Sequence, residues 1–283
     1  MRSYVPEFKM RPARNFKEAL RMLKHGEWRP FAGGTDLMVL FEAGNLTHAK
    51  YLSLQGLKEL KGIRVKKDNV DIGAMTTYRE IQESAALLKE FPLLAKAAEV
   101  TGAVAIQNRG TLGGNIANAS PAADSLAVLL IYGASLLLAS HQGSRWLDYA
   151  EFHTGYKKTL LEPGEIIQTI RLPRGRARWR QYYRKVGTRN AQAISKVVFA
   201  GMADTSRNHL NDIRIALGSV APTVIRTYET ERFMKLGDWP LARERFVDEL
   251  RPIDDLRSTA AFRRQVALNV FDEFLEFIGC RIG

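Results

Sequence analysis

Two pairs of adjacent glycines, each followed by polar side chains, are the residues of this chain best suited to holding a ligand. The first pair lies within Ala32–Leu37 and the second within Thr111–Asn115, and the sequence has no other. Glycine permits positive φ and close approach of another molecule, and free amides in such a segment form a nest for an anion. One such segment is usually a simple turn. The two together predict a shared phosphorylated ligand.

The second pair opens a longer polar stretch, residues 111–124, in which Gly, Asn, Ser and Asp stand between two apolar segments. This mixture favours a loop over a helix or a strand. Neither pair fits the usual nucleotide-binding patterns, because the chain lacks both Gly-x-Gly-x-x-Gly and the Gly-Lys-Ser/Thr ending of a P-loop. The residues alone therefore predict a phosphate-binding segment without naming its ligand.

At both glycine pairs the chain resembles the flavoprotein (medium) subunit of the molybdenum hydroxylases, the family of xanthine dehydrogenase and aerobic carbon monoxide dehydrogenase. Both segments are similar to the FAD-binding signature of that family. Further similar stretches follow in the same order along nearly the whole chain, at 107–110, 163–165, 185–187, 193–197, 216–223 and 255–263. The resemblance implies an oxidoreductase subunit that binds FAD.

The resemblance also implies that the two segments wrap the pyrophosphate and ribityl chain of FAD. The residues implied are Ala32, Gly33, Gly34, Thr35 and Asp36 in the first segment, and Thr111, Gly113, Gly114 and Asn115 in the second. Some of them have a structural alternative. Thr111 and Asn115 could instead cap a turn, and Asp36 could cap the segment that follows it.

Four further residues complete the implied site. By resemblance, Asp124 binds ribityl or ribose hydroxyls; alternatively, it caps a helix that begins near Ser125. By resemblance, Lys185 matches a lysine near the isoalloxazine, where a cation stabilises the reduced flavin. Alternatively, Lys185 is an ordinary surface lysine. Leu161 matches a position whose main chain contacts the ring, and its alternative is core packing. Arg29 is expected to approach the phosphates.

No catalytic residue and no metal site are expected within the chain. Its five histidines are scattered, and the single cysteine, Cys280, excludes an internal disulfide or a four-cysteine cluster and is expected to pack on the last helix. The resemblance places the remaining groups on partners: [2Fe-2S] clusters on a small subunit and molybdopterin on a large one, with NAD or another electron acceptor. Two alternatives stay open, a stand-alone FAD-dependent reductase of related fold and a non-enzymatic flavin-binding or assembly protein.

The bulk composition is that of a folded protein large enough for two domains, with 283 residues, 46% of them hydrophobic and 25% charged. No apolar run is long enough to span a membrane, and Met1–Pro6 lacks the apolar core of a signal peptide. A cytoplasmic location is therefore expected.

The net charge is +12, and residues 171–189 are basic without any acid. In an extended strand, alternating arginines would share one face, namely Arg174, Arg176, Arg178 and Arg180. Such a face is either a solvated surface or a docking surface for an acidic partner or an anionic cosubstrate. Nucleic-acid binding is not expected, because no motif for it accompanies the charge.

The elements that position these residues can be predicted from periodicity and caps. A helix over Phe16–Lys24 with Asn15 as its cap precedes a β-α-β unit that ends at Tyr51–Leu54. Further strands are expected at 70–73, 134–139, 166–172, 181–185, 195–203 and 212–218, and further helices at 78–85, 92–100, 125–130, 227–235, 241–249 and 259–278.

This order of elements is typical of an α+β protein. The resemblance implies a PCMH/vanillyl-alcohol-oxidase-like FAD-binding domain over 1–173, with subdomains of about 1–55 and 56–173. A C-terminal α+β domain with an antiparallel sheet and helices is expected over 174–283. FAD is expected to lie between domains, where cofactor sites commonly form.

Overall fold

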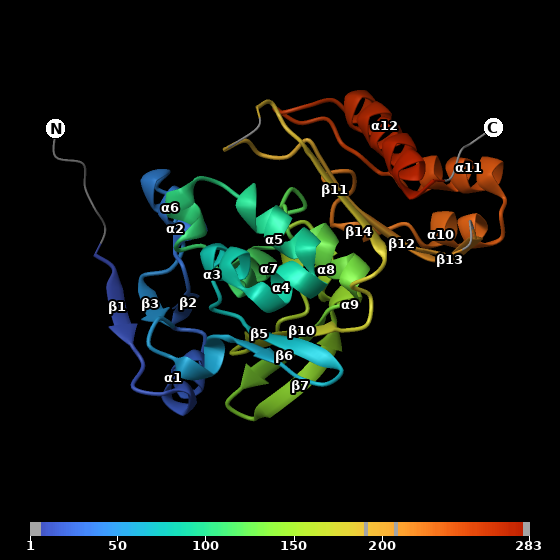
Figure 1. Ribbon diagram of the computed structural model, residues 1–283. Helices are drawn as coiled ribbons and strands as arrows, with labels where there is room; N and C mark the ends of the chain where they lie inside the picture. Colours follow the sequence, from blue (N-terminus) through green and yellow to red (C-terminus); the bar gives the residue numbers. More distant parts are fainter. Residues whose placement is uncertain (1–6, 190–191, 207–208, 280–283) are drawn as a thin grey trace.

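The computed structural model describes residues 7–189, 192–206 and 209–279 (Figure 1). Met1–Pro6 and Cys280, on which the expectations about a signal peptide and a packing cysteine rest, lie outside these ranges. A small parallel sheet in the order β1 (Lys9–Pro12), β3 (Lys50–Ser53), β2 (Arg29–Phe31) forms the N-terminal part, together with α1 (Phe16–Leu23) and α2 (Thr35–Glu42). The predicted β-α-β unit is therefore present as β2, α2 and β3.

An antiparallel sheet forms the base of the next part. Its order is β4 (Ile63–Val65), β5 (Asn69–Gly73), β10 (Ile166–Pro173), β6 (Ser135–Ser140) and β7 (Gly143–Asp148). A single 3-10 turn, η1 (Lys58–Leu60), precedes β4, and a short hairpin, β8 (His153–Gly155) and β9 (Lys158–Thr159), precedes β10. The sequence did not predict β4 or β7, which lie at the two edges of the sheet.

Helices cover one face of this sheet (Figure 1). They are α3 (Tyr78–Glu83), α4 (Ala85–Glu90), α5 (Pro92–Glu99), α6 (Val104–Gln107), α7 (Leu112–Asn118), α8 (Leu126–Tyr132) and α9 (Tyr149–Phe152). The helix α8 is buried on all sides, since each of its seven residues is inaccessible or nearly so. It is therefore the centre of the molecule rather than a surface helix.

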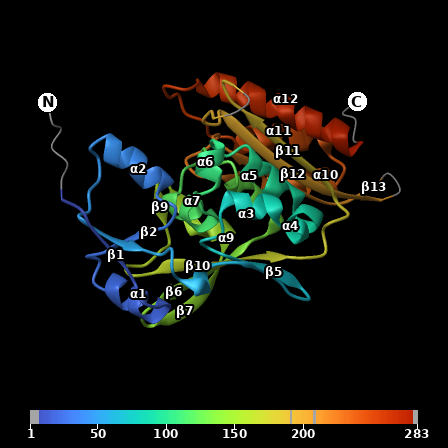
Figure 2. The same cartoon turned by 60° about the vertical axis from the view of Figure 1, so that its left-hand side comes forward.

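A second antiparallel sheet packs on the other side of these helices. Its strands follow the chain order: β11 (Arg180–Val186), β12 (Val197–Ser206), β13 (His209–Gly218) and β14 (Ile225–Arg226). Its inner face belongs to the same buried cluster as α8 through Tyr183, Val198 and Met202. Its outer face carries α10 (Tyr228–Lys235), α11 (Trp239–Glu249) and α12 (Ala260–Ile278), so sheets and helices alternate in layers (Figure 2).

The predicted α+β class is confirmed by these three sheets and their covering helices. One local prediction is wrong: part of the polar stretch 111–124 is not a loop, because residues 112–118 form α7. Thr111 provides the start signal, since its side chain accepts a hydrogen bond from the amide of Gly114 at 3.2 Å. A good cap and tight packing outweigh the low helix propensity of two glycines.

The basic stretch is the second correction. Arg174, Arg176 and Arg178 do not lie on a strand, because β10 ends at Pro173 and β11 begins at Arg180. Arg174 bonds Glu90 at 2.8 Å and the carbonyls of Lys66 and Lys67. Much of this charge therefore holds the protein together rather than lining a docking face. No helix among the described residues combines the length and the apolar content that a membrane crossing requires.

Candidate functional site

The first glycine pair lies where β2 meets α2. Gly34 has φ +77° and stands at the N-cap of α2, which has no capping side chain. Within the part of the chain that the structure describes, the amides of Gly33–Leu37 donate to no protein acceptor. Free amides at the start of a helix attract an anion, because the helix dipole adds to their partial positive charge. This segment is an open donor set.

Two cations and an amide side chain border that donor set. Arg29 belongs to β2, and Lys157 lies in the turn between β8 and β9. Lys157 Nζ donates to Asn118 Oδ1 at 2.5 Å, and Asn118 Nδ2 donates to Asp36 Oδ1 at 2.9 Å. Desolvation lowers the pKa of Lys157, Asp36 acts to raise it, and the charge of Arg29 acts to lower it further. These effects place all four side chains in one electrostatic environment suited to phosphate oxygens.

The second glycine pair is closed. The amide of Leu112 donates to the carbonyl of Thr76 at 3.0 Å, and that of Gly113 donates to Ala74 at 2.9 Å. The amides of Gly114 and Asn115 both bond Thr111, one to its side chain and the other to its carbonyl. The prediction of an anion nest is therefore wrong for this segment, because the start of α7 is bonded to the residues that follow β5 and to its own cap.

The glycines of both pairs are required by contacts within the protein. A Cβ on Gly33 would overlap the carbonyl of Arg109, and one on Gly113 would lie 2.5 Å from the Cβ of Ala74. A Cβ on Gly114 would lie 3.7 Å from that of Ala32, so the two segments pack against each other. Close approach of other atoms explains why glycine stands at these positions, but the approaching atoms belong to this chain and not to a ligand.

Asp124 and Lys185 form a buried ion pair at the boundary between α8 and β11. Lys185 Nζ lies 2.8 Å from Asp124 Oδ2 and also donates to the carbonyl of Val100 at 2.8 Å. Ser195 Oγ donates to the other carboxylate oxygen at 2.6 Å. Both side chains of the pair are less than a tenth exposed. The structure thus brings together two residues that lie 61 positions apart in sequence.

This environment argues against the structural alternatives considered for Asp124 and Lys185, and their contact with FAD stays a prediction. Burial raises the pKa of Asp124, while the Lys185 ammonium and the Ser195 hydroxyl act to lower it. Asp124 does not cap α8, which begins at Leu126 with Ser125 at its N-cap and no side-chain cap. Lys185 is not a surface lysine, and its charge is already balanced by a carboxylate.

The other predicted residues have simpler surroundings. Asn115 Oδ1 accepts a hydrogen bond from Ser125 Oγ at 2.8 Å, which links the second glycine segment to the neighbour of Asp124. Asp36 does not cap α2 but binds Asn118. Leu161 is half-buried against the central core, and its amide lies 3.4 Å from Thr159 Oγ1. Contact of the Leu161 main chain with a flavin ring stays a prediction.

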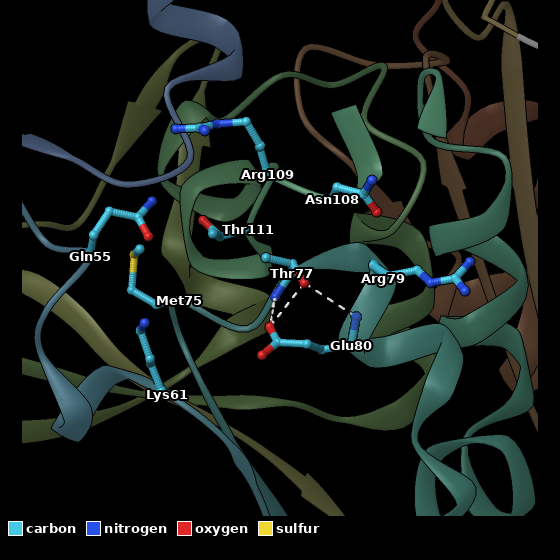
Figure 3. Close-up of a pocket in the computed structure, with 9 residues that line it drawn as sticks. All are labelled: Gln55, Lys61, Met75, Thr77, Arg79, Glu80, Asn108, Arg109 and Thr111. Carbon is cyan, nitrogen blue, oxygen red and sulfur yellow. Dashed lines mark hydrogen bonds between the residues drawn. The ribbon is translucent and has the colours of Figure 1, made fainter. Parts of the chain in front are cut away.

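A cavity of about 430 Å³ opens beside the start of α7 (Figure 3). Its lining residues are Gln55, Lys61, Met75, Thr77, Arg79, Glu80, Asn108, Arg109 and Thr111. Thr77 and Glu80 form the capping box of α3 on its wall. Of the predicted cofactor residues only Thr111 lines it, although Gln55 donates to the carbonyl of Ala32 at 3.1 Å. The cavity therefore adjoins the open donor set and is separate from the Asp124–Lys185 pair.

No cluster of potential metal ligands occurs among the residues that the structure describes. His153, the histidine nearest to α7, bonds the carbonyl of Ile116 at 2.9 Å through Nε2, and burial lowers its pKa. Sequence reasoning missed Lys157 and Asn118, which lie in a turn and a helix without a recognisable motif. It also missed Ser195, although the stretch 193–197 stood out by its similarity to the family.

Comparison with known families and proteins covers nearly the whole chain. Residues 6–175 match the family model described as the FAD binding domain in molybdopterin dehydrogenase, and residues 181–278 match that of the CO dehydrogenase flavoprotein C-terminal domain. The glyceraldehyde dehydrogenase medium chain of Sulfolobus acidocaldarius is 31% identical over 271 residues, which cover 93% of this chain and 95% of that protein. The carbon monoxide dehydrogenase medium chain of Hydrogenophaga pseudoflava is 29% identical over 273 residues, covering 93% of each.

Solved structures show the same similarity in three dimensions. Carbon monoxide dehydrogenase from Hydrogenophaga pseudoflava, in a form that lacks the Mo-pyranopterin moiety, aligns with a TM-score of 0.91 at 27% identity. The alignment covers 98% of this chain and all of the matching chain. The crystal structure of cyanide-inactivated Cu,Mo-CO dehydrogenase gives the same TM-score at 25% identity.

Proposed function

Since this chain belongs to the molybdopterin dehydrogenase family as its FAD-binding subunit, we propose that it transfers electrons within an iron–sulfur and molybdopterin complex. In this proposal it receives electrons from [2Fe-2S] clusters on a small partner subunit, while a large subunit carries molybdopterin and oxidises the substrate. It delivers the electrons to NAD or another acceptor. A cytoplasmic location and a division into domains at 1–173 and 174–283 belong to the same proposal.

The observation that supports this function most strongly is the open donor set at the start of α2. Five consecutive amides have no acceptor among the described residues, and Arg29 and Lys157 lie beside them. This arrangement fits a pyrophosphate better than any other group of FAD. The residues present therefore fit the cofactor. Gly33, Gly34, Thr35 and Asp36 would hold the phosphates through their main chain, and the Thr35 hydroxyl would add a side-chain hydrogen bond. Arg29 and Lys157 would supply the charge.

The closed second segment supports the site by a different route. Thr111, Gly113, Gly114 and Asn115 fix α7 against β5 and against Ala32, so they hold the first segment in place. Asn118 extends from α7 to Asp36 and Lys157. We therefore assign these residues to shaping the pyrophosphate site, with their main chain directed mostly at the protein itself.

Asp124 and Lys185 would serve the other end of the cofactor. When bound, FAD supplies the redox chemistry that the side chains of this chain lack. Lys185 holds a positive charge in a dry site, and Asp124 balances it at 2.8 Å. The pair is neutral as a whole, so it presents a dipole and two hydrogen-bonding groups, while the stabilising effect of an isolated cation is largely cancelled. Leu161 would supply main-chain contact beside it.

Reconstitution with FAD tests the proposal. The full chain, incubated with FAD and freed of excess, is expected to show flavin absorbance at one cofactor per chain. FMN, which lacks the pyrophosphate bridge and adenosine, should bind at least tenfold more weakly. The variant K157Q should weaken FAD binding about fivefold, and K158Q, at the first residue of β9, is the matched control. Absence of flavin uptake by the wild-type chain would overturn the proposal.

The partner assignment needs a separate measurement. Co-expression with a candidate iron–sulfur subunit and a candidate molybdopterin subunit should give a complex that elutes as one species. Reduction of the small subunit's clusters in that complex is then expected to bleach the flavin absorbance before NAD or a dye is reduced. Bleaching that requires direct addition of NADH, with no response to reduced clusters, would contradict the proposed direction of electron flow.

A further inference from the structure

A buried arginine on α12 connects the C-terminal helices to the Asp124–Lys185 pair. Arg263 is 3% exposed, and its Nη1 donates to the carbonyls of Lys196 and Ser219, both at 2.9 Å. Its Nη2 binds both carboxylate oxygens of Asp255 at 2.9 Å. One planar guanidinium therefore fixes three separate chain segments, which a lysine could not do with the same geometry.

Ser219 is the point where these segments meet the FAD-binding part. Its φ of +66° lies in the left-handed region, which is strained for a residue other than glycine. Its amide donates to the carbonyl of Pro121 at 2.8 Å, and its hydroxyl donates to the carbonyl of Ser195 at 3.0 Å. With its own carbonyl bound to Arg263, every polar atom of Ser219 is used.

The same contacts determine where Ser195 stands. Ser195 is 1% exposed and donates its hydroxyl to Asp124 at 2.6 Å, while its carbonyl is held by Ser219. Pro121, three residues before Asp124, is held by the amide of Ser219. Ser219 thus keeps a backbone conformation that costs free energy. Its hydrogen bonds lead to Asp124 through Ser195 on one side and through residues 121–124 on the other.

We propose that Ser219, Arg263 and Asp255 are positioning residues for the flavin site. Resting on the proposed function, this inference assigns them the task of holding Ser195 and residues 121–124 so that the Asp124–Lys185 pair keeps its orientation toward the cofactor. None of the three touches the ion pair directly. They act through the Ser195 hydroxyl on one side and the Pro121 carbonyl on the other.

The variant S219G is the sharpest test. Glycine adopts φ +66° freely, so the backbone strain is relieved, and only the hydroxyl bond to Ser195 is lost. The free energy of unfolding should stay close to that of the wild type, while the dissociation constant for FAD rises about tenfold. The visible circular dichroism of the bound flavin should change as well, because the surroundings of the ring are altered. R263K should weaken FAD binding to a similar degree.

A control comes from an arginine pair of the same domain. Arg226 binds the buried carboxylate of Glu231 with two nitrogens, the shorter bond at 2.7 Å, and has no contact with Ser195 or Asp124 in the described chain. R226M should lower stability but leave the FAD dissociation constant and the flavin spectrum unchanged. Equal FAD affinity in S219G and the wild type would overturn the inference. Loss of affinity in R226M as large as in R263K would also overturn it, since general destabilisation would then explain both.

Comparison of the wild type with D124N and S219G separates the positioning role from the function on which it rests. Failure of the wild-type chain to bind FAD would refute the proposed function. Weaker FAD binding in D124N with unchanged binding in S219G would refute the positioning role alone. If R263K does not fold, the S219G measurement decides the question.

Discussion

The two glycine pairs look alike in sequence, yet they differ in what their main chain offers. The first pair leads into α2, which has no capping side chain, and five of the amides there have no acceptor within the described ranges. The second lies within the first turn of α7, which has Thr111 as its cap, and the amides of residues 112–115 are all bonded within the protein. One segment is open to a ligand, and the other is closed on the protein and continues to the Asp124–Lys185 pair.

The difference follows from one residue at the same place in each segment. Gly34 at the N-cap of α2 has no side chain to bond the first amides. Thr111 at the N-cap of α7 has one, and the segment after β5 supplies the carbonyls of Ala74 and Thr76. A helix start without a capping side chain leaves its first amides unbonded, which costs free energy unless water or a ligand accepts their hydrogen bonds. An uncapped start beside a capped one therefore supports the proposal that the first segment binds the ligand.

The largest expected effect concerns the far end of the closed segment. K185M leaves the Asp124 carboxylate buried without its partner, which should cost about 3–5 kcal/mol in the free energy of unfolding. The double variant D124N/K185M should recover a large part of this loss, because no charge remains buried. Urea denaturation followed by circular dichroism measures both. If K185M lowered the free energy of unfolding no more than substitution of a surface lysine does, this end of the segment would be open to water.

The second effect tests the contact that joins the two segments. In G33A the new methyl group overlaps the carbonyl of Arg109, so either the first segment or residues 109–110 must move. The expected loss is about 1–3 kcal/mol in the free energy of unfolding, together with loss of FAD binding. G56A is the matched control, because a Cβ there meets nothing within 4 Å. If G33A kept the stability and the FAD affinity of the wild type, the claim that the closed segment holds the open one would be wrong.

The sequence predicted most elements that carry strong local signals. Asn15 caps α1 as predicted, and Thr77 caps α3. Each side chain accepts a hydrogen bond from the amide three residues ahead. The long helix α12 lies at residues 260–278, within one residue of its predicted start. By contrast, β4 and β7 are edge strands with exposed positions, and α7 contains two glycines. In those elements tertiary pairing outweighs local propensity.

The candidate site was predictable in its residue types and less so in its contacts. The family resemblance pointed to Asp124 and Lys185, but nothing local indicates that they bind each other across 61 residues. Lys157 and Asn118 have no motif, and only the fold brings them to Asp36. Ser219 shows no local sign of positive φ, which is usually marked by glycine or asparagine. Long-range pairing of this kind is set by the packing of sheets and helices.

A pH titration of ligand binding sharpens the description of the open segment. Because desolvation lowers the pKa of Lys157, its ammonium loses the proton below the ordinary value of a lysine. Affinity for an anion should therefore be complete at neutral pH and fall as pH rises through that lowered pKa. ADP is the better probe, since its phosphates are fully ionised throughout. Its dissociation constant should rise about fivefold between pH 8 and about 10.5. In K157Q the curve should be flat.

The smallest effect gives the most direct comparison, because it changes a threonine in each segment. T111A removes the cap of α7 and should cost about 1 kcal/mol in the free energy of unfolding. T35A removes a side chain at the first position of α2 that has no hydrogen bond within the described chain, so stability should change by less than about 0.5 kcal/mol. FAD affinity should respond more to T35A than to T111A when both are compared at equal folded fraction. The reverse pattern, with T35A costing stability and T111A costing affinity, would mean that the open and closed roles had been assigned to the wrong segments.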